Sequence, residues 1–209
     1  MPSISHIPTS VRKSTQALNY FARLATSGAP QPELNKLKAL KLLFFADRYH
    51  IRKYGRPVCD SAYFAMAKGP VASDAKHVAE DAKRLDFHAR SYARRFIRQK
   101  GDTFDYTSVA QVDLAVLSKT DLEALNFAWG VFGHYSKFQL CEITHHYPEW
   151  KRHARTLQRG PHRRVPMDYA DFFDEPDAGY NPCHELSNKD REIARELYLD
   201  SRAVAELWE

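Results

Sequence analysis

The sequence predicts a mostly helical α+β domain, in which a helical bundle surrounds a central buried helix and includes a small antiparallel sheet. Three observations support this fold class. Apolar residues recur at spacings of three and four over most of the chain, which is typical of amphipathic helices. One helical stretch, residues 42–46, is apolar on all sides and needs neighbours all around it. Short aromatic or alternating segments bounded by turn residues indicate strands.

The size of the chain fits one substantial domain. A length of 209 residues with 44% hydrophobic residues is enough to bury a core and leaves some chain over. We expect one domain over residues 8–175. Residues 176–209 are expected to form an appendage made of a loop and an amphipathic helix.

The first helix is predicted from about residue 8 to residue 27. Val11, Leu18 and Phe21 recur there at helical spacings. The following sequence, SGAPQP, interrupts the helix because two prolines and a glycine cannot continue it.

The second helix, from about residue 33 to residue 54, is predicted to be the centre of the domain. Truncation of any one of its core side chains is expected to lower the free energy of unfolding by roughly 2–5 kcal/mol. They are Leu42, Leu43, Phe44 and Phe45. Gly55 fits a C-terminal cap, and Pro57 prevents the helix from resuming.

A strand is predicted in the segment SAYFAMAK, residues 61–68, because it is short, aromatic and bounded by turns. We expect Gly69 and Pro70 to form a turn that ends this strand and leads into a helix over residues 73–85. Ser73 or Asp74 would be the N-cap of that helix.

A hairpin is predicted over residues 93–108, with Gly101 in its turn. Together with residues 61–68 it suggests one antiparallel sheet of about three strands.

Helices return after residue 109, and their starts are marked by serine followed three residues later by a side-chain acceptor. These pairs are Ser118 with Asp121, Ser136 with Gln139, and Ser187 with Asp190. Pro148 suits the first turn of another helix, expected over residues 148–159.

The formal net charge is +5, but the basic residues are scattered over the whole chain and several are interleaved with acids. The segment over residues 151–164 is different, because it contains no acidic residue. Its cations are Lys151, Arg152, Arg155, Arg159, Arg163 and Arg164. The segment is a candidate surface for phosphate or for an acidic partner.

A cytoplasmic location without membrane contact is expected. No apolar run approaches the roughly 20 residues of a membrane span, and the N-terminal sequence lacks the apolar core of a secretory signal. Cys59, Cys141 and Cys183 are odd in number and far apart, which favours three reduced thiols over disulfides or a zinc site.

Neither a catalytic nor a metal-binding pattern is present. His145 and His146 are adjacent and point in different directions on a helix, so they do not form a zinc-protease motif. Cys183 and His184 are likewise adjacent, which is the wrong spacing for an activated nucleophile. The sequence also lacks the glycine motifs that bind phosphate. We therefore predict no enzymatic activity, no cofactor and no metal.

Residues 118–146 contain a helix, a tight turn and a second helix in the order of a helix-turn-helix. The second helix has few side chains that could read bases, chiefly Lys137 and Gln139. Nucleic acid is therefore not the expected partner, although a DNA-binding regulatory protein remains an alternative.

Three blocks of the sequence together resemble the Panacea domain of SocA-like antitoxins and phage-associated GepA-like proteins. They are LKALKLLFFADRYHIRKYGRPV, AYFAMAKGPV, and LSKTDLEALNFAWGVFGHYSKFQLCEITHHYPEW. The segment MDYADFF is similar to the end of that domain, so the likeness extends from about Val11 to Phe173. Asp47 and Arg48 depart from the family pattern, and we expect both at the surface.

The resemblance implies a non-enzymatic antitoxin that neutralises a cognate protein toxin by direct protein–protein binding. A proteolytic adaptor that delivers the toxin to a cytosolic protease is an alternative. The resemblance gives a structural role to the core side chains of the second helix and to the turn residues Gly55, Pro57, Gly69 and Pro70. His145 and Trp150 could border the partner surface, together with Lys151, Arg152, Arg155 and Arg159. The final helix is a second candidate contact, and the oligomeric state stays open.

Overall fold

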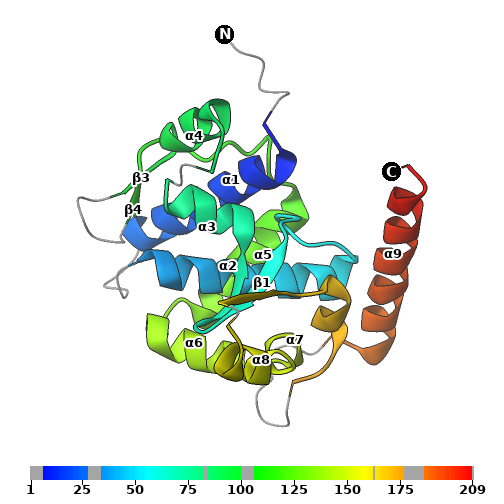
Figure 1. Ribbon diagram of the computed structural model, residues 1–209. Coiled ribbons are helices and arrows are strands. Elements are labelled where there is room, and N and C mark those ends of the chain that lie inside the picture. Colours follow the sequence, from blue (N-terminus) through cyan, green and yellow to red (C-terminus); the bar gives the residue numbers. More distant parts are fainter. Residues whose placement is uncertain are drawn as a thin grey trace.

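The computed structural model describes residues 7–27, 34–81, 84–99, 106–161, 163–176 and 186–208. It has the predicted class: a predominantly helical α+β fold with small antiparallel sheets. Helix α2 (Lys36–Tyr54) crosses the middle of the molecule (Figure 1). It is covered by α1 (Thr9–Ser27), α5 (Lys119–Phe132), α6 (Lys137–His145) and part of α9 (Asn188–Glu206).

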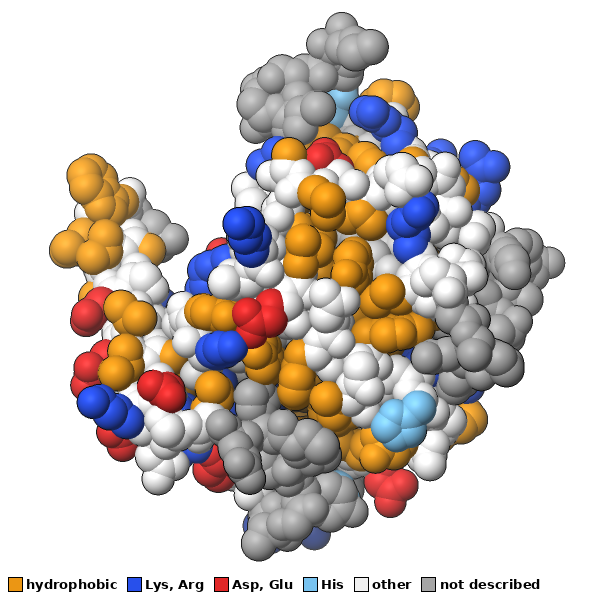
Figure 2. Space-filling view, turned by 180° about the vertical axis from the view of Figure 1, so that it is seen from behind, with side chains coloured by type: hydrophobic (Ala, Val, Ile, Leu, Met, Phe, Trp, Pro, Cys, Tyr) orange, Lys and Arg blue, Asp and Glu red, His pale blue; other side chains and the backbone are white. Residues whose placement is uncertain are grey.

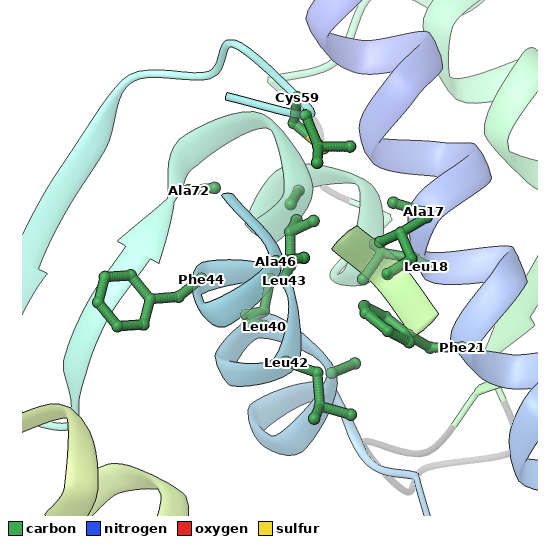
Figure 3. Close-up of a cluster of buried hydrophobic side chains, with 14 of the residues drawn as sticks. Ala17, Leu18, Phe21, Leu40, Leu42, Leu43, Phe44, Ala46, Cys59 and Ala72 are labelled. Atoms are coloured by element: carbon green, nitrogen blue, oxygen red, sulfur yellow. The ribbon is translucent and has the colours of Figure 1, made fainter. Parts of the chain in front are cut away.

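The core forms on both sides of α2. Leu43 faces Leu18 and Phe21 of α1, whereas Phe44 points to the opposite side, toward the sheet (Figure 3). The rings of Phe45 and Phe132 stack with centroids 3.8 Å apart. The four apolar side chains predicted for the core, Leu42, Leu43, Phe44 and Phe45, are all buried. This explains why the helix is apolar all round over these residues.

The main sheet has three antiparallel strands. Strand β1 (Tyr63–Met66) lies in the centre, between β2 (Gly69–Ala72) and β5 (Arg164–Pro166). Phe64 pairs with both Val71 and Pro166. The sequence did not reveal β5, because three residues with one apolar side chain carry no strand pattern.

The predicted hairpin forms a second, separate sheet of two strands. Strand β3 (Ile97–Gln99) pairs with β4 (Tyr106–Ser108) in antiparallel fashion. The expectation of one sheet that contains both the hairpin and β1 was therefore wrong. The turn assigned to Gly101 lies outside the described residues.

The second predicted turn was also misplaced. The chain turns at Ala67 and Lys68, and Gly69 and Pro70 are the first residues of β2, paired with β1. Helix α3 (Ser73–Ala79) then begins directly after Ala72, which is its N-cap in place of Ser73 or Asp74. The predicted turn from strand to helix is thus a hairpin followed by a helix.

Three helical segments differ from the prediction. Helix α4 (Phe87–Arg94) was not foreseen. The helix expected over residues 148–159 is broken into α7 (Pro148–Lys151) and α8 (Ala154–Arg159). Residues Tyr169–Phe173 form the short 3₁₀ helix η2.

The predicted helix ends agree well with the structure. Ser118 and Ser136 each form a full capping box with the residue three positions later. Ser187 accepts a hydrogen bond from the backbone of Asp190 at the start of α9. Gly55 is the C-cap of α2, with φ of 70°, a left-handed conformation that favours glycine.

Helix α9 docks against the end of α2. Ala194 and Tyr198 are buried there, and Arg52 and Arg191 both pair with Glu175. A Cβ atom on Gly55 would lie 2.8 Å from the Ala194 carbonyl oxygen and 2.9 Å from the Leu197 Cβ. The glycine that ends α2 therefore also lets α9 approach.

We expect Gly55→Ala to lower the free energy of unfolding by about 1–3 kcal/mol, because it strains a left-handed residue and pushes α9 away. Urea unfolding measures the loss, and trypsin should cleave within α9 faster than in the wild type. Gly130→Ala is the control, since nothing lies within 4 Å of that position in α5. The docking account fails if Gly55→Ala leaves both stability and cleavage unchanged.

Candidate functional site

A hollow on the surface is formed by the start of α2, the β1–β2 hairpin, α3 and the segment from α8 to β5. Its volume is about 570 Å³. A neighbouring hollow of about 490 Å³ shares Met66, Val71, Lys76 and Glu80 with it. We call the two together the basic groove.

The floor of the basic groove is apolar. Leu37 and Leu40 come from α2, Met66 and Val71 from the hairpin, and Leu157 from α8. Their positions follow from the fold, because the hairpin crosses the first turns of α2 and α8 precedes β5 on the other side of β1. Such a floor can bury apolar side chains of a ligand.

The rim of the basic groove is mostly cationic. Its cations are Lys36, Lys68, Lys76, Arg84, Arg163 and Arg164, and Glu80 is the carboxylate among its described lining residues. Lys36 and Lys76 bind Glu80 at 2.7 and 2.6 Å. Although partial burial raises the pKa of Glu80, the hydrogen bonds from the two lysines outweigh it and lower the pKa. Glu80 is therefore ionised and already paired.

The second hollow is lined by Phe64 and His77. The guanidinium of Arg164 lies over the Phe64 ring, 4.7 Å from its centroid, in a cation–π contact. Burial lowers the pKa of His77, and the charge of Lys76 lowers it further. At neutral pH this histidine is an uncharged donor or acceptor beside the cations.

A buried lysine, Lys41, binds the backbone of the β1–β2 hairpin. The Nζ atom of Lys41 donates to the Pro70 carbonyl oxygen at 2.6 Å, and burial lowers its pKa to about 7. Gly69 has φ of 96°, and a Cβ there would lie 2.4 Å from the Thr144 Oγ1 and 2.7 Å from the Lys41 Nζ. Glycine at this position is thus required both by the backbone and by the close approach of Lys41.

His145 and Trp150 also hold the hairpin. Their rings stack with centroids 3.7 Å apart, and the Trp150 Nε1 donates to the Met66 carbonyl oxygen at 2.9 Å. Trp150 is only 8% exposed. These contacts give both residues a structural environment, and a direct role in partner binding remains a prediction.

The basic residues predicted for the partner surface lie on α7, on α8 and in the turn between them. Arg152 binds Asp171 at 2.6 Å and Asp174 at 2.8 Å. Lys151, Arg155 and Arg159 are exposed. Helix α8 turns Leu157 toward the basic groove, so the predicted segment forms one of its walls. The opposite wall, from α2, the hairpin and α3, was missed.

Asp47 and Arg48 are buried, which corrects the expectation that they lie at the surface. Asp47 is 0% and Arg48 5% exposed. The Asp47 carboxylate accepts hydrogen bonds from the backbone N–H groups of Val58 and Cys59 and from the Tyr63 hydroxyl. Arg48 binds the buried carboxylate of Glu149 at 2.8 Å. Both residues therefore belong to the core.

Reactive side chains elsewhere in the described ranges, such as thiols, do not form a catalytic arrangement. Burial raises the pKa of the thiols of Cys59 and Cys141, so neither is an activated nucleophile. No group of three or more histidine, cysteine or acidic side chains that could hold a metal occurs among the residues described. The pair Cys183 and His184 lies outside them.

Helix α9 presents a second exposed surface, seen along the left edge of Figure 2 with apolar side chains at its tip. Leu207 and Trp208 are 83% and 86% exposed, and Leu197 and Val204 are also exposed. Its proposed contact with a partner stays a prediction. Removal of the chain beyond residue 179 should leave neutralisation unchanged if α9 is not part of the contact.

The model of the antitoxin SocA-like family, Panacea domain, matches residues 40–151. This is more than half of the 209-residue chain, and the chain belongs to this family. Neither the curated proteins nor the solved structures contain a match. In the described part of the chain, no helix combines the length and apolar character needed to cross a membrane.

Part of the basic groove lies within the residues that match the family model. Leu40, Met66 and Val71 of its floor lie within the matched residues, whereas Leu157 and Arg163 lie beyond them. The groove thus joins the family domain to a segment that follows it in this chain.

Proposed function

We propose that this chain is an antitoxin that neutralises a cognate protein toxin by direct binding in the cytoplasm, without a cofactor. The observation that carries the proposal is membership of the SocA-like antitoxin family. The family suggests a non-enzymatic role, in which a folded surface masks the toxin. The basic groove supports this proposal, because its apolar floor and charged rim have the composition of a protein-binding site.

Masking requires a stable, stoichiometric complex. The toxin is inactive only while its functional surface is covered, so the dissociation constant must lie below the cellular toxin concentration. A rigid surface favours such affinity, because little ordering is needed on binding. The contacts of Lys41 and Trp150 with the hairpin provide that rigidity on one side of the groove.

The test is growth rescue in a bacterial host. Candidate toxins, beginning with the protein encoded beside this chain, are expressed alone and together with the tagged chain. We expect growth arrest by the toxin alone, full recovery on co-expression, and recovery of both proteins in one complex. Asp47→Ala, which should unfold the chain, is the control that must not rescue.

Other outcomes contradict masking in different ways. Rescue with loss of the toxin in a protease-dependent manner would support the adaptor alternative. Rescue by repression of the toxin gene, without a protein complex, would support the DNA-binding alternative. If no candidate arrests growth and nothing is co-purified, the antitoxin proposal fails.

A further inference from the structure

We propose that the basic groove binds an acidic, amphipathic peptide segment, with apolar side chains on its floor and Asp or Glu side chains at its rim. This inference rests on the proposed function in one respect: it assigns such a segment to the cognate toxin. The groove itself is defined by the structure alone.

Charge is the first argument. Glu80 already binds Lys36 and Lys76, so the remaining cations determine the potential of the rim. Lys68, Arg84 and Arg163 are exposed and form no ion pair with another described residue. A rim with this excess of cations favours an anionic ligand and speeds its association.

The apolar floor identifies the kind of anion. Phosphate groups would gain nothing from Leu37, Leu40 and Leu157, whereas leucine or phenylalanine side chains of a peptide would be removed from water there. The combination of floor and rim therefore favours an acidic protein segment over nucleic acid.

The groove is preformed. The β1–β2 hairpin is held by hydrogen bonds from Lys41 and Trp150 to its backbone, and β5 pairs with β1 beside it. Met66 and Val71 consequently have fixed positions before any ligand arrives. A short peptide can bind such a surface without reorganising the domain.

The experiment uses the full chain and a fluorescent 12-residue peptide of glutamate and leucine. Two further peptides replace leucine by serine or glutamate by lysine. Lys68→Glu combined with Arg163→Glu reverses the rim. Lys119→Glu combined with Lys189→Glu is the matched control, with the same change in net charge at exposed sites outside the groove.

We expect the glutamate–leucine peptide to bind the wild type and the control variant equally. Rim reversal should weaken its binding by roughly 100-fold, because like charges then face each other. Higher salt should weaken wild-type binding, and the serine and lysine peptides should bind at least roughly tenfold more weakly. Circular dichroism confirms that both variants are folded.

Equal binding by the rim-reversed and control variants would overturn the inference, and so would a 20-base-pair DNA duplex that displaces the peptide from the groove. The same two variants are then tested for growth rescue. If the rim-reversed chain binds no acidic peptide but still neutralises the toxin, the assignment of the bound segment to the toxin fails and the antitoxin proposal stands. If the peptide binds as expected but no toxin is neutralised, only the antitoxin proposal fails.

Discussion

Asp47→Ala is expected to lower the free energy of unfolding by about 3–5 kcal/mol, enough to unfold much of the protein. The carboxylate of Asp47 accepts hydrogen bonds at 2.7 Å from the Val58 amide, 3.0 Å from the Cys59 amide and 2.7 Å from the Tyr63 hydroxyl. Alanine leaves these three buried donors without a partner, and each costs roughly 1–3 kcal/mol when unsatisfied. Urea denaturation followed by circular dichroism measures the loss.

Asp47→Asn is the matched variant, because the amide oxygen can still accept from the two backbone groups. It should lose far less stability than Asp47→Ala. A similar loss in both variants would contradict the hydrogen-bonding role. In that case the stability that Asp47 contributes would come from its negative charge.

The pH dependence of Asp47 gives a separate check. Burial raises the pKa of Asp47 from 3.8 to about 6 in the folded protein, so between these pH values the folded state binds more protons than the unfolded state. The contribution of Asp47 to stability therefore falls as pH rises from about 4 to 6. Asparagine does not titrate, so Asp47→Asn should be more destabilising relative to the wild type at pH 4 than at pH 7.

Glu149→Ala is expected to cost about 3–5 kcal/mol, because it leaves the buried Arg48 without its counter-ion. Glu149 is 0% exposed, and its Oε1 accepts from the Arg48 Nε at 2.8 Å. The guanidinium would keep the Asp174 carbonyl oxygen and the Tyr147 ring, which do not neutralise its charge. Thermal or urea unfolding measures the effect.

Arg152→Ala is the control for this prediction. Arg152 lies three residues away and forms ion pairs with Asp171 and Asp174, but its side chain is 43% exposed. Its loss should cost less than about 1 kcal/mol. The double variant Arg48→Met with Glu149→Met should be more stable than Glu149→Ala. A double variant that is less stable than Glu149→Ala would argue against an uncompensated buried charge as the cause of the loss.

The local elements of the fold were predictable where the signal lies in neighbouring residues. The capping serines Ser118 and Ser136 and the C-cap Gly55 fixed three helix ends. The apolar run of α2 located the core. Strand β5 was missed because its existence depends on pairing with β1, about a hundred residues earlier in the chain.

The buried charges of α2 could not be predicted from sequence. Hydrophobicity alone places Asp47 and Arg48 outside, and their partners are supplied by distant segments. The carboxylate of Glu149 and the carbonyl group of Asp174 satisfy Arg48 only after folding. A charged residue inside an otherwise apolar helical run was the available signal, and it was taken for a surface position.

The sequence pointed to one of the two walls of the candidate site. The acid-free segment over residues 151–164 drew attention to one wall of the basic groove. Lys36, Lys68 and Lys76 form the other wall and are far apart from one another in the sequence. Their convergence depends on the hairpin crossing the start of α2, which local patterns do not specify.

The most direct test of the central claim is a titration of purified toxin with the purified chain, in the absence of any protease. Toxin activity and the amount of intact toxin are measured at each ratio. Masking predicts complete inhibition at a ratio of about one to one, with all of the toxin intact and recovered in a complex. Undiminished toxin activity at a large excess of the folded chain would contradict neutralisation by direct binding.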